Sequence, residues 1–236
     1  RRHFLDSELC QLDKVYLYQL SNYNKVVLQR NKLLKELYLH PDYREVLDVL
    51  DMQLVQYGSA LIQRRQTFAE ELGEIVHRIH SQLSGGQEEM ELKYEPNVTV
   101  DAFAQMLFSN RERDMRLKTT ATGPHRDDIS FVVNGVDIRK FGSQGQQRTA
   151  ALSLKLSEIE LVKRLIGDTP VLLLDDVLSE LDSGRQNYLL NSIENIQTLI
   201  TCTGLDEFVN HRFSINRIYK VTDGSVTVEN KQEADR

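Results

Sequence analysis

The stretch Pro-Val-Leu-Leu-Leu-Asp-Asp, residues 170–176, decides how the fold is interpreted. Its apolar run is typical of a strand buried on both faces of a parallel sheet, and its two carboxylates stand where open α/β sheets bind ligands. Because hard cations prefer oxygen ligands, we expect Asp175 to hold Mg²⁺ beside a phosphate. Asp176 would orient or deprotonate an attacking water. A plain buried strand that ends in a polar turn is the alternative.

A turn upstream of this strand suits a terminal phosphate. Ser143-Gln144-Gly145-Gln146 precedes a predicted helix of about 20 residues, and a helix start leaves backbone N–H groups unpaired at a positive dipole end. Ser143 adds a hydroxyl, and Gly145 lets the backbone approach closely. These four residues are the candidate nucleotide contacts, with an ordinary helix cap as the alternative.

A second segment has the sequence of a phosphate-binding turn but lacks the helix that should follow it. Leu83-Ser84-Gly85-Gly86-Gln87 has the five letters of the ABC-transporter signature, but Glu88, Glu89 and an alternating pattern follow it instead of a helix. Acidic neighbours repel phosphate, so we interpret this segment as the glycine stop of the preceding helix.

The first third of the chain is helical. Apolar residues recur every three or four positions over 6–39, where His40-Pro41 predicts a stop, and again over 42–83. The second helix would be about 60 Å long. We therefore expect an antiparallel coiled-coil hairpin that forms an arm, with an ordinary helical bundle as the alternative.

Strands and helices then alternate. The patterns predict a strand at 90–94, a helix over 101–117, a hairpin about Asn134-Gly135 and, after the helix from Gln144, strands at 170–175 and 197–202 around a helix from Ser183. A hairpin about Asp223-Gly224 closes the series. The fold class is α/β with a largely parallel sheet, divided into an arm domain (1–118) and a C-terminal lobe (119–236).

The composition restricts the function classes. With 29 basic and 35 acidic residues, the net charge of −6 excludes a global basic field, so any DNA contact must be local. The candidates are Arg111, Arg113, Arg116 and Lys118, although a solvated surface is the commoner outcome; Arg64-Arg65 is weaker. No apolar run nears the roughly 20 residues that span a bilayer, and two distant cysteines indicate a reducing, cytoplasmic setting.

Three motifs together carry a family resemblance. They are Thr122-Gly123-Pro124-His125-Arg126-Asp127-Asp128, the turn at 141–148, and the run from Leu172 to Asp182, which includes the Walker B-like strand and a D-loop-like Ser179-Glu180-Leu181-Asp182. The chain resembles the bacterial RecF family, recombination and repair ATPases related to Rad50 and the SMC proteins. The resemblance implies the C-terminal lobe of an ABC-type ATPase head plus the helical arm.

The resemblance also implies a mechanism. Members would dimerise on ATP, bind DNA at gaps and single-strand/double-strand junctions, and act with RecR and RecO in loading RecA during the SOS response. Ser143 and Gly145 would reach the γ-phosphate held by the opposite protomer, while Asp175 and Asp176 act on the nucleotide of their own. Ser179 and Asp182 would lie at the dimer interface.

Two departures lower the expected activity. No GxxxxGK[ST] loop is present, so we expect it in a segment outside this sequence, and this chain alone to be inactive. Thr203 stands where ABC ATPases have a switch histidine, and Asp176 replaces the usual Glu, which implies a weak, DNA-stimulated ATPase. A Rad50- or SMC-like fragment and a non-catalytic coiled-coil scaffold are the rivals. His125 and Asp127 resemble metal ligands, but a hydrogen-bonded loop is favoured.

Overall fold

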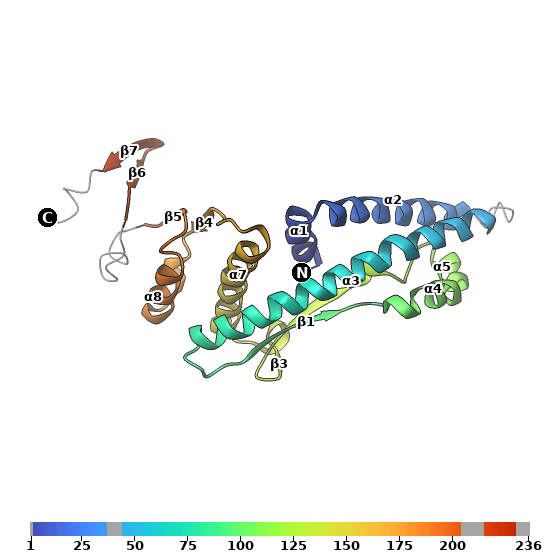
Figure 1. Cartoon of the computed structure of the whole chain (residues 1–236), viewed down its shortest axis with the longest axis horizontal. Helices are drawn as coiled ribbons and strands as arrows, with labels where there is room; N and C mark the ends of the chain where they lie inside the picture. Colours follow the sequence, from blue (N-terminus) through green and yellow to red (C-terminus); the bar gives the residue numbers. More distant parts are fainter. Residues whose placement is uncertain (1, 37–43, 204–214, 230–236) are drawn as a thin grey trace. The chain divides into compact units, whose positions relative to one another are not determined.

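The computed structural model describes residues 2–36, 44–203 and 215–229 (Figure 1). It contains two compact units, Arg1–Asp168 and Thr169–Arg236. In the described residues no helix is long and apolar enough to cross a membrane.

The first unit begins with two helices, α1 (Arg2–Leu12) and α2 (Lys14–Glu36). Asp13 separates them, because its carboxylate accepts hydrogen bonds from the backbone N–H of Val15 (2.9 Å) and Tyr16 (3.0 Å) and so starts a new helix. The prediction of one helix over 6–39 was therefore wrong at this point. The stop expected at His40-Pro41 lies outside the described residues.

The long helix α3 (Arg44–Leu83) has 40 residues and packs against α2 (Figure 1). The pair is antiparallel, since Arg30 of α2 bonds Asp51 of α3 while Tyr16 bonds Arg65. The predicted helix over 101–117 is split at Asn110 into α4 (Val100–Ser109) and α5 (Arg111–Leu117). At Gly58 a Cβ would lie 2.5 Å from the ring of Phe103, so glycine permits the close approach of α3 and α4.

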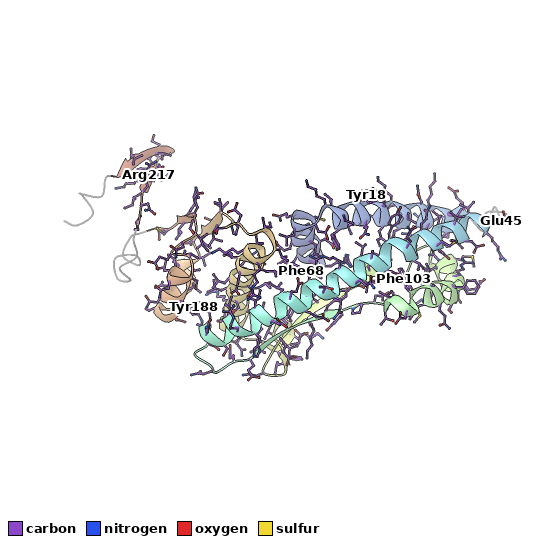
Figure 2. The ribbon with its side chains drawn as sticks, in the orientation of Figure 1. Tyr18, Glu45, Phe68, Phe103, Tyr188 and Arg217 are labelled. Atoms are coloured by element: carbon purple, nitrogen blue, oxygen red, sulfur yellow. The ribbon has the colours of Figure 1, made fainter. Side chains whose placement is uncertain are left out.

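Apolar residues on α3 form the core of this unit. Leu54, Leu61, Phe68 and Leu72 are almost fully buried, and Phe68 is labelled in Figure 2. Tyr18 on the outer face of α2 is 64% exposed and points to solvent. The helical hairpin is thus confirmed as an arm, whose inner face carries the apolar stripe.

An antiparallel sheet and a further helix flank α3. Strands β1 (Met90–Glu95), β2 (Asp128–Val133) and β3 (Val136–Asp137) pair in that order. Asn134 and Gly135 have φ of 48° and 80°, which confirms the predicted turn. The short helices η2 (Pro124–Arg126) and α6 (Ile138–Phe141) lead into and out of β2 and β3, and α7 (Gln144–Ile166) packs against α3.

Two boundaries in this unit bear on the predictions. Helix α3 ends at Leu83 and is followed by Gly85 and Gly86 with φ of 64° and 78°, so the glycine-stop interpretation is confirmed. Strands β1 and β2 come from either side of residue 118, and the compact unit continues to Asp168. The predicted division into an arm domain (1–118) and a C-terminal lobe (119–236) therefore stays a proposal.

The second unit holds the predicted strand–helix–strand. Strands β4 (Leu172–Asp175) and β5 (Thr198–Thr201) are parallel, with η3 (Leu178–Glu180) and α8 (Ser183–Ser192) between them. Strands β6 (Ile218–Thr222) and β7 (Ser225–Glu229) form the closing hairpin.

Strand β4 differs from its prediction in burial. Leu173 is 72% exposed and Leu199 of β5 is 56% exposed, whereas Leu174 is buried. The strand is not buried on both faces, because within the described residues its sheet has two strands and one uncovered face. The expectation of a largely parallel sheet is met only by this pair.

A buried arginine stabilises the junction of α1, α3 and η2. The guanidinium of Arg65 donates to Asp6 (2.7 Å), Asp127 (2.9 Å), the Tyr16 hydroxyl (2.9 Å) and the Pro124 carbonyl (2.7 Å). We call this group the Arg65 centre. Its side chain is 1% exposed, so Arg65 cannot serve as the surface basic residue considered for DNA.

Candidate functional site

Residues Ser143–Gln146 form the exposed start of α7. We call them the signature turn, because the family resemblance gives them the role of the ABC signature in place of residues 83–87. Ser143 is the N-cap: its hydroxyl accepts a hydrogen bond from the Gln146 N–H (3.2 Å), and the Gln146 side-chain oxygen accepts one from the Ser143 N–H (3.0 Å). This reciprocal capping box arises from the Ser-x-x-Gln spacing. Ser143, Gln144 and Gly145 are all exposed, so the helix start is open to an incoming group.

The capping box leaves two donors for a ligand. It uses the N–H groups of Ser143 and Gln146, whereas those of Gln144 and Gly145 have no intrahelical acceptor at a helix start. Beside Gly145 the nearest atom that a Cβ would meet is the Ser143 hydroxyl oxygen, at 3.9 Å. Two N–H groups at the positive end of a 23-residue helix favour an anion.

The strand-end carboxylates lie in the second unit. Asp175 ends β4 opposite Thr201 of β5, whose hydroxyl donates to Asp175 Oδ1 (2.5 Å). The same hydroxyl accepts a hydrogen bond from the Asp176 N–H (3.1 Å). Both aspartates are exposed. One threonine therefore orients the two predicted functional residues.

Asp176 adopts an uncommon backbone conformation. Its φ of 51° is in the left-handed region, which costs free energy for a residue with a side chain although Asp tolerates it better than most. The Ser179 hydroxyl stabilises the turn by donating to the Asp176 carbonyl (2.9 Å). The turn comes directly after β4, which ends at Asp175.

The remaining predicted site residues in this unit are exposed. Asp182 caps α8 by accepting a hydrogen bond from the Arg185 N–H (3.0 Å), and this bond lowers the pKa of its carboxyl. Thr203 lies in an exposed bend after β5. Their roles at a dimer interface and as a switch position stay predictions.

The donor set at the strand end fits Mg²⁺. An exposed carboxylate and a hydroxyl supply oxygen atoms only, and Mg²⁺ in nucleotide sites commonly takes one or two carboxylates and completes its shell with water and phosphate. Within the described residues no three His, Cys, Asp or Glu side chains gather as a metal cluster. Asp175 would thus hold the ion together with the nucleotide.

The four basic candidates differ in availability. Arg111 pairs with Asp48 (2.6 Å) and Asp51 (2.7 Å) and lies over the Phe108 ring, so its charge is already partnered. Arg113 and Arg116 are exposed on α5. Lys118 follows the helix as its left-handed cap, not as part of the same helical face. DNA contact by these residues stays a prediction.

The loop with His125 and Asp127 is hydrogen-bonded, as favoured. His125 bonds the Tyr23 hydroxyl (2.7 Å) and the Thr120 carbonyl (2.9 Å), while Asp127 bonds Arg65 and the Asn97 N–H. Burial lowers the pKa of His125, which keeps the imidazole neutral. Both residues serve the packing of the arm.

Two residues were missed by the reasoning from sequence. Thr201 could have been found, because adjacent parallel strands bring their carboxyl ends together. Glu88, which accepts a hydrogen bond from the Gln146 side-chain amide (3.0 Å), had no signal beyond its place after a glycine turn.

Comparisons with known proteins bear on the family and the fold of the chain. No family model matches the chain. It is 59% identical over 232 residues to the DNA replication and repair protein RecF of Lachnospira eligens, covering 98% of this chain and 64% of that relative. RecF of Agathobacter rectalis is also 59% identical, over 228 residues, 97% of this chain and 63% of the relative.

A solved structure extends the similarity to the fold. The structure described as the recombination mediator protein RecF with ATP in the RecFOR pathway superposes with a TM-score of 0.86 and 34% identity, over 98% of this chain and 62% of that chain. This chain therefore spans less than two thirds of the length of the relatives it matches. In sequence and in fold it is a RecF-type segment that combines the C-terminal lobe of an ABC-type ATPase head with a helical-hairpin arm.

Proposed function

We propose that this chain is the signature-bearing part of an ATP-dependent recombinational repair protein that dimerises on ATP. The observation that carries the proposal is the exposed, capped start of α7, which offers the N–H groups of Gln144 and Gly145 to an anion. The relative whose structure is described with ATP supports the choice of nucleotide.

Each exposed site residue has a role in this proposal. Ser143, Gln144 and Gly145 contact the γ-phosphate of ATP held by a second protomer, and Gln146 keeps the turn in place through the capping box. Asp176 orients or deprotonates the attacking water. Ser179 and Asp182 contact the second protomer, and Thr203 can hydrogen-bond a phosphate without carrying charge.

Asp175 is the proposed ligand of Mg²⁺. When bound, the ion offsets the negative charge of the β- and γ-phosphates. Thr201 keeps the Asp175 carboxylate in place through its hydroxyl and holds the Asp176 backbone by the same oxygen. Because Asp176 is a shorter carboxylate than Glu and Thr203 carries no charge, hydrolysis is slow; the family resemblance adds that DNA stimulates it.

The proposed partners follow from the relatives. RecF is described in those relatives as a replication and repair protein and as a recombination mediator in the RecFOR pathway. We extend this to gapped or junction DNA, to RecR and RecO, to RecA indirectly, and to a cytoplasmic location. On this chain Arg113 and Arg116 are the exposed basic residues of α5 that DNA phosphates could contact.

The test is Ser143→Arg in the complete polypeptide. A large cation at the helix start blocks the approach of a second protomer's phosphate, so ATP binding to each protomer should persist while the ATP-dependent dimer is lost. Light scattering with and without ATP measures the mass, and a fluorescent nucleotide measures binding. Ser109→Arg, on the exposed end of α4, is the matched control and should dimerise normally. An unchanged dimer in Ser143→Arg contradicts the proposal.

A further inference from the structure

We infer that His80 and Glu88 are positioning residues for the signature turn, linking its capping glutamine to helix α3. The inference rests on the proposed function and deepens it: the pair sets the geometry in which the turn meets a phosphate. It also gives a use to the glycine segment 83–87, which ends α3 and places Glu88.

The connection is a ring of five hydrogen bonds that is closed by the peptide bond between Gly145 and Gln146. Gln146 Nε2 donates to Glu88 Oε1 (3.0 Å), Glu88 Oε2 meets His80 Nε2 (3.1 Å), and His80 Nδ1 meets the Ser153 hydroxyl (2.9 Å). Ser153 donates to the Thr149 carbonyl (2.8 Å), and Thr149 donates to the Gly145 carbonyl (2.8 Å). The ring therefore begins and ends within the signature turn; we call it the bracing ring.

Burial makes the bracing ring rigid. His80, Thr149 and Ser153 are fully buried, and the Glu88 side chain is 19% exposed. Glu88 is itself held by Ser84, whose hydroxyl accepts a hydrogen bond from the Glu88 N–H (3.2 Å). Buried hydrogen bonds are strong in a low dielectric, so displacing one member is costly.

The donor and acceptor roles in these bonds show where the hydrogens of His80 and of the Ser153 hydroxyl lie. The Ser153 hydroxyl has one hydrogen, which it gives to Thr149, so it must accept from His80 Nδ1. The other ring nitrogen then faces a carboxylate oxygen, and one hydrogen must lie between His80 Nε2 and Glu88 Oε2. Glutamine at position 88 reproduces both contacts, because its oxygen accepts from Gln146 and its NH₂ donates to a neutral His80.

The bracing ring fixes the orientation of the Gln146 amide. With Nε2 held by Glu88, Oε1 must face the Ser143 N–H, as the capping box requires. If Glu88 is removed, the amide can turn and present NH₂ to that N–H, which breaks the box. The N–H groups of Gln144 and Gly145 then lose their fixed direction, whereas Asp175 and Asp176 belong to the other unit and are not members of the ring.

The experiment measures the ATP-dependent dimer of the complete polypeptide by sedimentation. Glu88→Ala should weaken dimerisation at least tenfold without changing nucleotide binding per protomer, and Glu88→Gln should restore it to within about threefold of the parent. His80→Ala provides a second loss variant. Arg78→Ala is the matched control, since Arg78 and Glu160 join the same two helices outside the ring, and it should stay within twofold.

The outcomes separate the two proposals. If the parent protein does not dimerise with ATP, the proposed function fails and this inference falls with it. If the parent dimerises but Glu88→Ala behaves like Arg78→Ala, only this inference is overturned. A purely structural role predicts that Glu88→Gln and Glu88→Ala follow their melting temperatures, so rescue by glutamine at equal stability identifies positioning.

Discussion

The Arg65 centre and the bracing ring are both buried polar networks on α3, but they end in different places. Arg65 donates to four oxygen acceptors from α1, α2 and the 122–128 loop, and its interactions remain among packed elements. The bracing ring runs from buried His80 to a turn whose outer residues are exposed.

Within one unit, the difference separates a network that only stabilises packing from one that would serve the proposed function. A buried charge whose contacts all lie inside the packed elements stabilises packing, and it leaves no hydrogen-bond donor at the surface for a ligand. A network of single hydrogen bonds that reaches an exposed helix start can hold donors for a ligand. Thus the Thr122–Asp128 motif, which helps to carry the family resemblance, binds Arg65, and the proposed phosphate contact lies at Ser143–Gln146.

The largest expected effect is that of Arg65→Ala. It leaves the buried Asp127 carboxylate without its cationic partner, so the free energy of unfolding should fall by about 3–5 kcal/mol. Urea denaturation measures the loss. Arg64→Ala is the matched control: Arg64 pairs with Asp13 at 3.3 Å on a partly exposed surface and should contribute less than about 1 kcal/mol. Equal losses in the two variants would remove the distinction drawn here.

A buried carboxyl on α7 tests what incomplete pairing costs. Burial raises the pKa of Glu158 to about 7 from 4.5, although Lys155 lowers it, and one of its oxygens has no partner among the described residues. Between pH 4.5 and 7 the folded chain therefore binds more protons than the unfolded chain, so stability falls as the pH rises.

Glu158→Gln removes this titration. Relative to the parent, the variant should gain about 3 kcal/mol between pH 4 and pH 8, at about 1.4 kcal/mol per unit of pKa shift. Urea denaturation at the two pH values provides the measurement. Glu160→Gln, which loses ion pairs to Arg78 and Arg164, should show no such gain. A difference between Glu158→Gln and the parent that does not grow with pH would contradict this account.

The smallest effect sharpens the description of the bracing ring. Ser153→Ala removes the acceptor for His80 Nδ1 and should cost about 1–2 kcal/mol, because a buried hydrogen bond is lost. Ser157→Ala is the control one turn away: its hydroxyl donates to the Ser153 carbonyl, and its loss should cost at most about 0.5 kcal/mol. Thermal unfolding compares the two, and an indistinguishable pair would show that the His80 contact contributes little.

Local signals predicted the fold better than long-range ones. Asn134-Gly135, Asp223-Gly224 and the Ser143 cap each contain their own turn chemistry, so their elements form as expected. The break at Asp13 was missed because one capping residue hardly disturbs a helical periodicity.

Burial of charge was the harder problem. Arg65 occupies the same stripe as Leu61 and Phe68, a signal that it faces inward, yet its partners Asp6 and Asp127 are distant in sequence. The turn proposed to contact phosphate could be found from sequence, but the residues that hold it could not, because Glu88 meets Gln146 only through the packing of α3 and α7.

The uncovered leucines of β4 and β5 have a practical consequence for any solution study. Leu173 and Leu199 give the isolated segment an exposed apolar sheet face, and such faces tend to associate with other apolar surfaces. A preparation of this chain alone would self-associate without nucleotide and bind dyes such as ANS. The particle size measured by light scattering would then reflect nonspecific association and not the ATP-dependent dimer. The nucleotide experiments therefore need the longer polypeptide.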